Sequence, residues 1–168
     1  MANNHTAGTT VRTFAPSELC QRMLAKTSKG TCGPCILYLE DGTIFYGRAC
    51  GAEGTATGEV CFNTSLEGYF EVMTDPSYAG QIVTMTYPQI GNYGIDETDV
   101  QSAFPGDTAR PASAPAMRGM IVRDMCATPS NWRSAVSVPE YLRAHGIVAI
   151  EGVDTRALVR HLRDNGSK

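Results

Sequence analysis

Residues 64–94 read TSLEGYFEVMTDPSYAGQIVTMTYPQIGNYG, and this stretch decides the fold. Residues 82–87 form an alternating apolar run that is typical of a β-strand. A turn-rich corner, Asp75-Pro76-Ser77-Tyr78, precedes the run, and a glycine-punctuated corner at 88–94 follows it. Proline presets φ for a turn, and an aspartate side chain can bond the backbone two residues on. We therefore predict a strand between two rigid bends, with the Ser77 hydroxyl displayed on the first bend.

The chain before this stretch predicts an antiparallel hairpin. Residues 36–40 and 43–50 have strand patterns, and Asp41-Gly42 between them is a two-residue hairpin signal because both positions favour positive φ. Residues 51–58 are a glycine-rich connection, and residues 59–64 predict a third strand. One or two helical turns are expected within residues 66–73.

The chain after this stretch alternates strands and helices. The elements expected are a buried strand at 119–124, a helix capped by Ser137 over 139–145, a buried strand at 147–150, and a helix that Asp154 caps and Gly166 ends. The order helix–strand–helix predicts a parallel strand, whereas the early hairpin predicts an antiparallel sheet. Together these patterns predict a layered α/β domain with two sheets.

The length of 168 residues suits one domain. Residues 1–34 are expected to be a flexible amino-terminal extension, with a short helix from Ser17 to about residue 25. Residues 35–168 form the predicted compact domain. Residues 96–117 carry prolines among alanine, serine and glycine without periodicity, which predicts a mobile surface insertion.

Composition argues against several classes of protein. A net charge of −3 supplies no global basic field for nucleic acid. No apolar run approaches the roughly 20 residues that span a bilayer. The amino terminus lacks the charged-then-apolar layout of a secretory signal. We therefore expect a cytoplasmic protein, although the threonine- and serine-rich start leaves a transit peptide open.

Cys32-Gly33-Pro34-Cys35 matches the thioredoxin active-site tetrapeptide. That chemistry places the first cysteine at a helix amino terminus, whereas here a predicted strand follows the motif. We favour a linker with two incidental thiols over a redox site. A zinc site would need two more ligands; Cys20 and Cys50 are present but belong to no second paired motif, so no metal is expected.

The sequence holds no complete catalytic constellation of its own. The histidines are His5, His145 and His161, and none accompanies a nucleophile elbow. A glycine-rich phosphate loop is also missing from the sequence. We therefore expect neither a self-sufficient hydrolase nor a kinase.

The last predicted helix carries Arg156, Arg160 and Arg163 at helical spacing. Like charges four residues apart repel by about a few tenths of a kcal/mol. The simplest interpretation is a solvated basic face. The functional alternative is a docking face for an acidic partner surface.

An ordered series of blocks resembles the small chain of glutamine-hydrolysing carbamoyl phosphate synthetase, in its amino-terminal domain, from about residue 36 to 166. The blocks are Leu39-Glu40-Asp41-Gly42-Thr43, Gly58-Glu59-Val60, Phe62-Asn63-Thr64-Ser65, residues 74–78, Gln81-Ile82-Val83-Thr84, Thr86-Tyr87-Pro88, Gly91-Asn92, Val122-Arg123-Asp124, Asn131-Trp132-Arg133, Val148-Ala149-Ile150 and Val153-Asp154-Thr155-Arg156. Each block is weakly specific, but the order of the series is very specific. The arm before Cys35 and the loop before Gly119 are longer than in a compact bacterial-type chain.

The resemblance implies a three-layer β/β/α swivelling-type domain with one mainly parallel and one antiparallel sheet. It implies partners: a class I glutaminase domain that follows in the parent chain, a synthetase subunit or domain, and L-glutamine. The catalytic residues would lie in that glutaminase domain, and ATP and metal ions only in the synthetase part, so this domain would need no cofactor.

By the same resemblance, Ser77 helps to bind glutamine and the domain docks the glutaminase to the synthetase. The alternative is a purely structural assembly module without substrate contact. Pyrimidine and arginine synthesis both stay open as the pathway, as do a fused and a two-chain parent enzyme.

Overall fold

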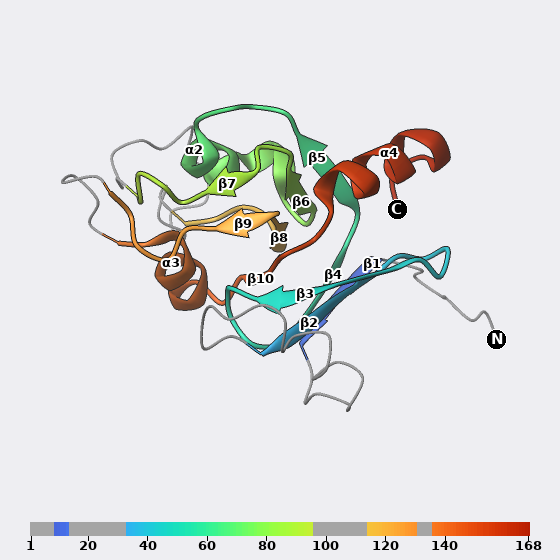
Figure 1. Ribbon diagram of the computed structural model, residues 1–168, viewed down its shortest axis with the longest axis horizontal. Helices are drawn as coiled ribbons and strands as arrows, with labels where there is room; N and C mark the ends of the chain where they lie inside the picture. Colours follow the sequence, from blue (N-terminus) through green and yellow to red (C-terminus); the bar gives the residue numbers. More distant parts are fainter. Residues whose placement is uncertain (1–8, 14–32, 96–113, 131–135) are drawn as a thin grey trace.

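The computed structural model describes residues 9–13, 33–95, 114–130 and 136–168. Figure 1 shows strands and helices combined in one mixed α/β fold, as the sequence predicts. The strands are β1 (Thr9–Thr13), β2 (Pro34–Tyr38), β3 (Ile44–Ala49), β4 (Thr55–Gly58), β5 (Val60–Asn63), β6 (Ile82–Met85), β7 (Gln89–Ile90), β8 (Gly119–Ile121), β9 (Asp124–Met125) and β10 (Val148–Glu151). The helices are α2 (Tyr69–Thr74), the short 3-10 helix η1 (Pro76–Tyr78), α3 (Val138–Ala144) and α4 (Thr155–Asn165).

The main sheet combines a parallel half and an antiparallel half. Its strand order is β4-β1-β2-β3-β10-β8-β6-β5. The pairs from β10 through β8 and β6 to β5 are parallel, and those from β10 through β3, β2 and β1 to β4 are antiparallel. β7 and β9 form a separate parallel pair. Where the sequence predicts two sheets, the structure therefore joins both kinds of pairing through β3 and β10.

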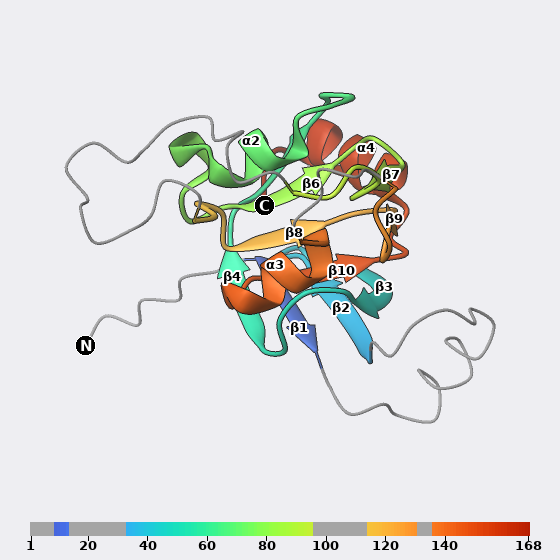
Figure 2. The same ribbon diagram turned by 90° about the vertical axis from the view of Figure 1, so that its left-hand side faces the viewer.

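The parallel half of the sheet is buried on both faces. Because side chains alternate along a strand, Val83, Met120 and Ala149 join one core with Phe70 of α2 and Leu142 of α3. The isoleucines of β6, β8 and β10 join a second core with the antiparallel half and α4. β1 contacts β10 and β4 contacts β6, so the antiparallel half folds back over the parallel half. Figures 1 and 2 both show β1 and β2 on the side of the molecule opposite α2.

The β2–β3 hairpin is confirmed, but its turn differs from the two-residue type that the sequence predicts. The Leu39 N–H donates to the Thr43 carbonyl at 2.9 Å, and the Gly42 N–H donates to the Leu39 carbonyl at 3.0 Å. Only Gly42 of the predicted pair has a positive φ, at 88°. Asp41 instead accepts a hydrogen bond from the Thr43 N–H through its side chain, at 2.9 Å. The connection is therefore a longer turn that closes with one left-handed glycine.

Two strands lie where the sequence does not predict them. β4 lies within residues 51–58, which were expected to be a connection. β1 lies within residues 1–34, the expected extension, and it pairs with both β2 and β4 while Val11 is fully buried. The domain boundary at residue 34 stays a prediction. The expected helix at 17–25 and the greater part of the expected insertion at 96–117 lie outside the described residues.

Both predicted helix caps are confirmed. The Ser137 side chain accepts from the Glu140 N–H, and the Glu140 carboxylate accepts from the Ser137 N–H, which forms a capping box at the start of α3. The Asp154 side chain accepts from the Ala157 N–H at 3.0 Å, and α4 ends before Gly166. The other predicted elements appear as β5, α2, β6, β8 and β10. The strand predicted at 119–124 is shorter than expected, because β8 ends at Ile121 and Asp124 begins β9 in the separate pair.

The two halves of the sheet meet at β3 and β10. Two residue pairs join these strands, Ile150 with Ala49 and Glu151 with Arg48. Arg48 and Glu151 also form an ion pair at 2.9 Å, with side chains 18% and 10% exposed. Burial raises the pKa of Glu151, while the Arg48 charge and the Met125 N–H oppose that rise. A side chain at Gly47 would collide with the Glu151 carbonyl, so glycine permits this close approach.

A matched pair of threonine substitutions tests the core around β6. Thr84 is fully buried, and its hydroxyl has no hydrogen-bond partner within the described part of the chain, whereas the buried Thr74 hydroxyl donates to the Phe70 carbonyl at 3.1 Å. We expect Thr84→Val to raise the free energy of unfolding by about 1 kcal/mol and Thr74→Val to lower it by about 1 kcal/mol. Denaturant unfolding measures both. Equal losses in the two variants would contradict this account.

The Arg48–Glu151 pair predicts a pH-dependent stability. Arg48→Met leaves the buried Glu151 carboxylate without its arginine partner. We therefore expect the free energy of unfolding to fall by about 2–4 kcal/mol near neutral pH. A carboxyl group whose pKa is raised by folding gives stability at low pH and loses it as the pH rises through the folded-state pKa. The deficit against the parent protein should therefore shrink as the pH is lowered, because protonation removes the unpaired buried charge.

The control is Arg123→Met, which removes a 4.0 Å pair with Asp154 whose side chains are more than half exposed. It should change stability by less than about 1 kcal/mol at each pH. Thermal unfolding at several pH values measures both variants. A deficit in Arg48→Met that stays constant with pH would refute the role of Glu151.

Candidate functional site

The bend after β6 is held by two tyrosines. The Tyr93 hydroxyl accepts from the backbone N–H groups of Gly68 and Tyr69, at 2.9 and 3.3 Å. The two rings stack with centroids 4.2 Å apart. The Tyr69 hydroxyl donates to the Gly94 carbonyl at 2.6 Å, and burial raises the pKa of Tyr69. This bend is therefore tied to the start of α2, as a rigid corner requires.

The bend before β6 displays Ser77. The Asp75 side chain accepts from the Ser77 N–H at 2.8 Å, and the Tyr78 N–H donates to the Asp75 carbonyl at 3.1 Å. Pro76 opens this 3-10 helix, η1. The Ser77 side chain is exposed. The structure thus places Ser77 on the stiff corner that the sequence predicts; its role in binding stays a prediction.

The three arginines of α4 lie on the exposed side of the helix. Arg156, Arg160 and Arg163 are exposed, whereas Leu158 and Leu162 are buried in the second core. The structure therefore brings the arginines together on one face of α4, as their spacing predicts. Ser77 lies on a different element, η1.

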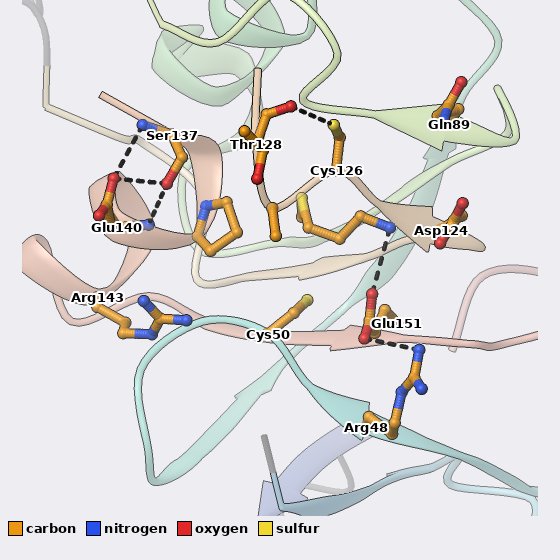
Figure 3. A pocket seen from close by; sticks show the side chains of 13 residues that line it. Arg48, Cys50, Gln89, Asp124, Cys126, Thr128, Ser137, Glu140, Arg143 and Glu151 are labelled. Carbon is orange, nitrogen blue, oxygen red and sulfur yellow. Dashed lines mark hydrogen bonds and ion pairs between the residues drawn. The ribbon is translucent and has the colours of Figure 1, made fainter. Parts of the chain in front are cut away.

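A separate hollow of about 560 Å³ lies between the end of β10, β9 and α3. Figure 3 shows Arg48 and Glu151 paired on one side of it and Ser137 paired with Glu140 on another. Arg143 reaches from α3 toward Cys50 in the same view. The lining residues are Arg48, Cys50, Gln89, Asp124, Met125, Cys126, Ala127, Thr128, Ser137, Pro139, Glu140, Arg143 and Glu151.

Two acidic groups of this hollow, Glu140 and Glu151, are already engaged within the fold. Glu151 pairs with Arg48 and accepts from the Met125 N–H. Hydrogen bonds from the Ser137 side chain and backbone lower the pKa of Glu140. The Cys126 thiol donates to the Thr128 carbonyl at 3.1 Å. The hollow offers polar groups for binding, but it contains no histidine that could activate a thiol.

Apart from Cys50, weighed as a zinc ligand, and Ser137, predicted as a helix cap, sequence reasoning did not single out these lining residues. One signal could have found two of them. Asp124 follows the buried strand β8, and Glu151 ends the buried strand β10, which runs parallel to β8. Polar residues at the carboxyl ends of neighbouring parallel strands gather at one edge of a sheet. Arg48 and Arg143 carry no comparable local signal, because chain folding alone brings them there.

The Cys35 thiol lacks the lowered pKa of a redox-active cysteine. Cys35 lies buried on β2, and burial raises the pKa of its thiol to about 12. A redox-active cysteine needs the opposite shift. Cys20 and Cys32 lie outside the described residues. Across the ranges that the structure describes, no group of three or more histidine, cysteine, aspartate or glutamate side chains is arranged to hold a metal ion.

No helix in the described ranges has both the length and the apolar composition needed to cross a membrane.

Comparison with known proteins identifies relatives over most of the chain. The chain is 55% identical over 133 residues to a carbamoyl phosphate synthase small chain of Syntrophotalea carbinolica, and the aligned region covers 79% of this chain and 33% of that protein. It is 54% identical over 132 residues to the small chain of Solidesulfovibrio magneticus, covering 79% and 32%. It is 54% identical over 135 residues to that of Xanthomonas axonopodis pv. citri, covering 80% and 32%.

The chain spans about a third of the length of these relatives. A family model described as the CPSase domain of the carbamoyl-phosphate synthase small chain matches residues 37–168. This match covers the compact domain from β2 to the end of α4. The chain therefore belongs to the family of carbamoyl-phosphate synthase small chains, as the resemblance seen in its sequence implies.

Proposed function

We propose that this chain is a non-catalytic domain of a glutamine-dependent carbamoyl phosphate synthetase, the enzyme that makes carbamoyl phosphate from glutamine, bicarbonate and ATP. The observation that carries the proposal is the family match over residues 37–168, together with similarity to small chains of this synthase. The domain would dock a glutaminase to the synthetase and contribute one side of the glutamine site.

The proposed fold is a three-layer β/β/α domain of the swivelling type. Two features support it: the antiparallel half folds back over the parallel half, and α2 and α3 pack on the other face of the parallel half. The layers would be antiparallel strands, parallel strands and helices. In this arrangement the parallel strands form a rigid middle layer, and the corner that carries Ser77 is built on its β6 strand.

Glutamine hydrolysis would be supplied by a class I glutaminase domain rather than by these residues. Burial raises the pKa of the Cys35 thiol to about 12 and that of Cys61 to about 11, which disfavours the nucleophilic thiolate. His161 is held by Asp41, with 2.6 Å between Nε2 and Oδ2, and His145 packs against Tyr141. These contacts support a division of labour in which ammonia then passes to a synthetase subunit or domain.

ATP and metal ions belong, in this proposal, to the synthetase part of the enzyme, and the assembly works in the cytoplasm. The product would feed pyrimidine or arginine synthesis. A purely structural assembly module is the second candidate function. The exposed arginines of α4 favour it, because docking through α4 requires no contact with substrate.

Ser77→Ala tests the proposed substrate contact. In the complete enzyme we expect the KM for glutamine to rise about tenfold, the factor that corresponds to one lost hydrogen bond of about 1.4 kcal/mol. Steady-state kinetics with glutamine measure the effect, and synthesis from added ammonium is the control because it bypasses glutamine. Unchanged glutamine kinetics would leave only the structural assembly module.

Charge reversal tests the proposed docking face. A variant with Arg156, Arg160 and Arg163 all changed to Glu should bind the synthetase subunit at least about tenfold more weakly at low ionic strength, and the loss should shrink as salt screens the charges. Calorimetric titration measures the affinity. Arg143→Glu, on the exposed side of α3, is the matched control. If the parent, the triple variant and Arg143→Glu all bind the synthetase subunit with equal affinity, the α4 arginines form a solvated face without a docking role.

A further inference from the structure

We propose that Asn63 and Tyr78 are positioning residues that hold Ser77 against the sheet in the geometry needed to meet glutamine. This inference rests on the proposed role of Ser77. The contact that carries it is a hydrogen bond from Asn63 Nδ2 to the Tyr78 hydroxyl, at 2.9 Å.

The corner that carries Ser77 needs an external support. η1 has three residues, and its other hydrogen bonds are local. The Ser77 N–H donates to the Asp75 side chain, and the Ala79 N–H donates to the Pro76 carbonyl at 3.0 Å. Such bonds fix the internal shape of a turn, but they do not fix its position relative to the sheet. That position decides where the serine hydroxyl lies.

Asn63 is itself held at the end of β5 by its backbone and its side chain. The Thr86 N–H donates to the Asn63 carbonyl at 3.1 Å, which ties it to the end of β6. The Ser65 N–H donates to Asn63 Oδ1 at 2.7 Å. Because a backbone N–H can only donate, this bond assigns Oδ1 as the acceptor and directs Nδ2 to Tyr78. The amide therefore reaches η1 from a fixed base.

Tyr78 receives this bond with its ring already anchored. It is half-buried and packs against the first core, which also contains α2 and α3. Ser77 thus lies between two fixed neighbours, with Asp75 bonded to its amide on one side and Tyr78 tied to β5 on the other. Loss of the Asn63–Tyr78 bond should shift the Ser77 hydroxyl without removing any protein group that contacts the substrate. Because substrate positioning is sensitive to shifts of about 1 Å, such a shift should weaken glutamine binding.

Tyr78→Phe in the complete enzyme tests the proposal, since it keeps the ring in the core and removes only the hydroxyl. We expect the KM for glutamine to rise about three- to tenfold with kcat changed much less, and the melting temperature to fall only slightly. Tyr46→Phe is the matched control, because Tyr46 is 49% exposed on β3. It should change neither kinetic parameter.

Two substitutions at Asn63 separate positioning from a general loss of structure. Asn63→Leu removes both side-chain hydrogen bonds and should raise the KM for glutamine at least as much as Tyr78→Phe. Asn63→Asp keeps an acceptor for the Ser65 N–H and a partner for the Tyr78 O–H, so it should restore a KM close to that of the parent enzyme. Failure of Asn63→Asp to improve on Asn63→Leu would overturn the proposal.

A double variant distinguishes this inference from the function on which it rests. If Tyr78 acts through Ser77, the variant with both Ser77→Ala and Tyr78→Phe should have the same KM as Ser77→Ala alone. Additive effects would overturn the positioning role. A Ser77→Ala effect without any effect of Tyr78→Phe would overturn only this inference, whereas unchanged kinetics of Ser77→Ala would overturn the proposed glutamine contact and the inference with it.

Discussion

The junction of β3 with β10 is the constraint on which the rest of the fold depends. β10 pairs parallel with β8 on one side and antiparallel with β3 on the other, and the antiparallel contact continues beyond its two residue pairs through hydrogen bonds from the Cys50 and Ala52 N–H groups to the Ala149 and Ile147 carbonyls. The ion pair of Arg48 with Glu151 and the close approach at Gly47 both lie at this contact. Because the sheet changes from parallel to antiparallel pairing here, one half can fold back over the other and create a second core.

This second core explains why β6 is a rigid base for the corners at its two ends. All four residues of β6 are buried, with Val83 in the core shared with α2 and α3 and Ile82 in the core shared with α4. A strand fixed on both faces transmits its position to the chain on either side. The bend after β6, which Tyr69 and Tyr93 hold, and the helix η1 before it are both positioned by this strand. Precise display of one hydroxyl is therefore a property of the whole packing arrangement.

Local patterns predicted the elements that local chemistry determines. Ser137 and Asp154 cap their helices, and Ser77 stands on its corner, because those hydrogen bonds involve neighbours in the chain. What the sequence could not reveal depends on distant pairing. β1 lies between β2 and β4 and pairs with both, so these strands depend on partners that are distant in the sequence. Likewise, Arg48 and Glu151 meet only after β3 and β10 have paired. The hairpin turn differs for a smaller reason: the loop closes between Leu39 and Thr43, so it is longer than two residues and only Gly42 has a positive φ.

The chemical character of the described residues fits a domain that positions groups. Burial makes the Cys35 and Cys61 thiols poor nucleophiles by raising their pKa values to about 12 and 11. Hydrogen bonds from the Thr43 amide and from His161 hold the pKa of Asp41 well below its usual range, so this carboxylate is an anchor for α4 and a weak proton acceptor. Shifts of this kind keep a buried thiol protonated and a hydrogen-bonded carboxylate ionised near neutral pH, and the contacts behind them hold neighbouring elements in place. In the proposed function, the same contacts would make this domain a support for chemistry supplied by another domain.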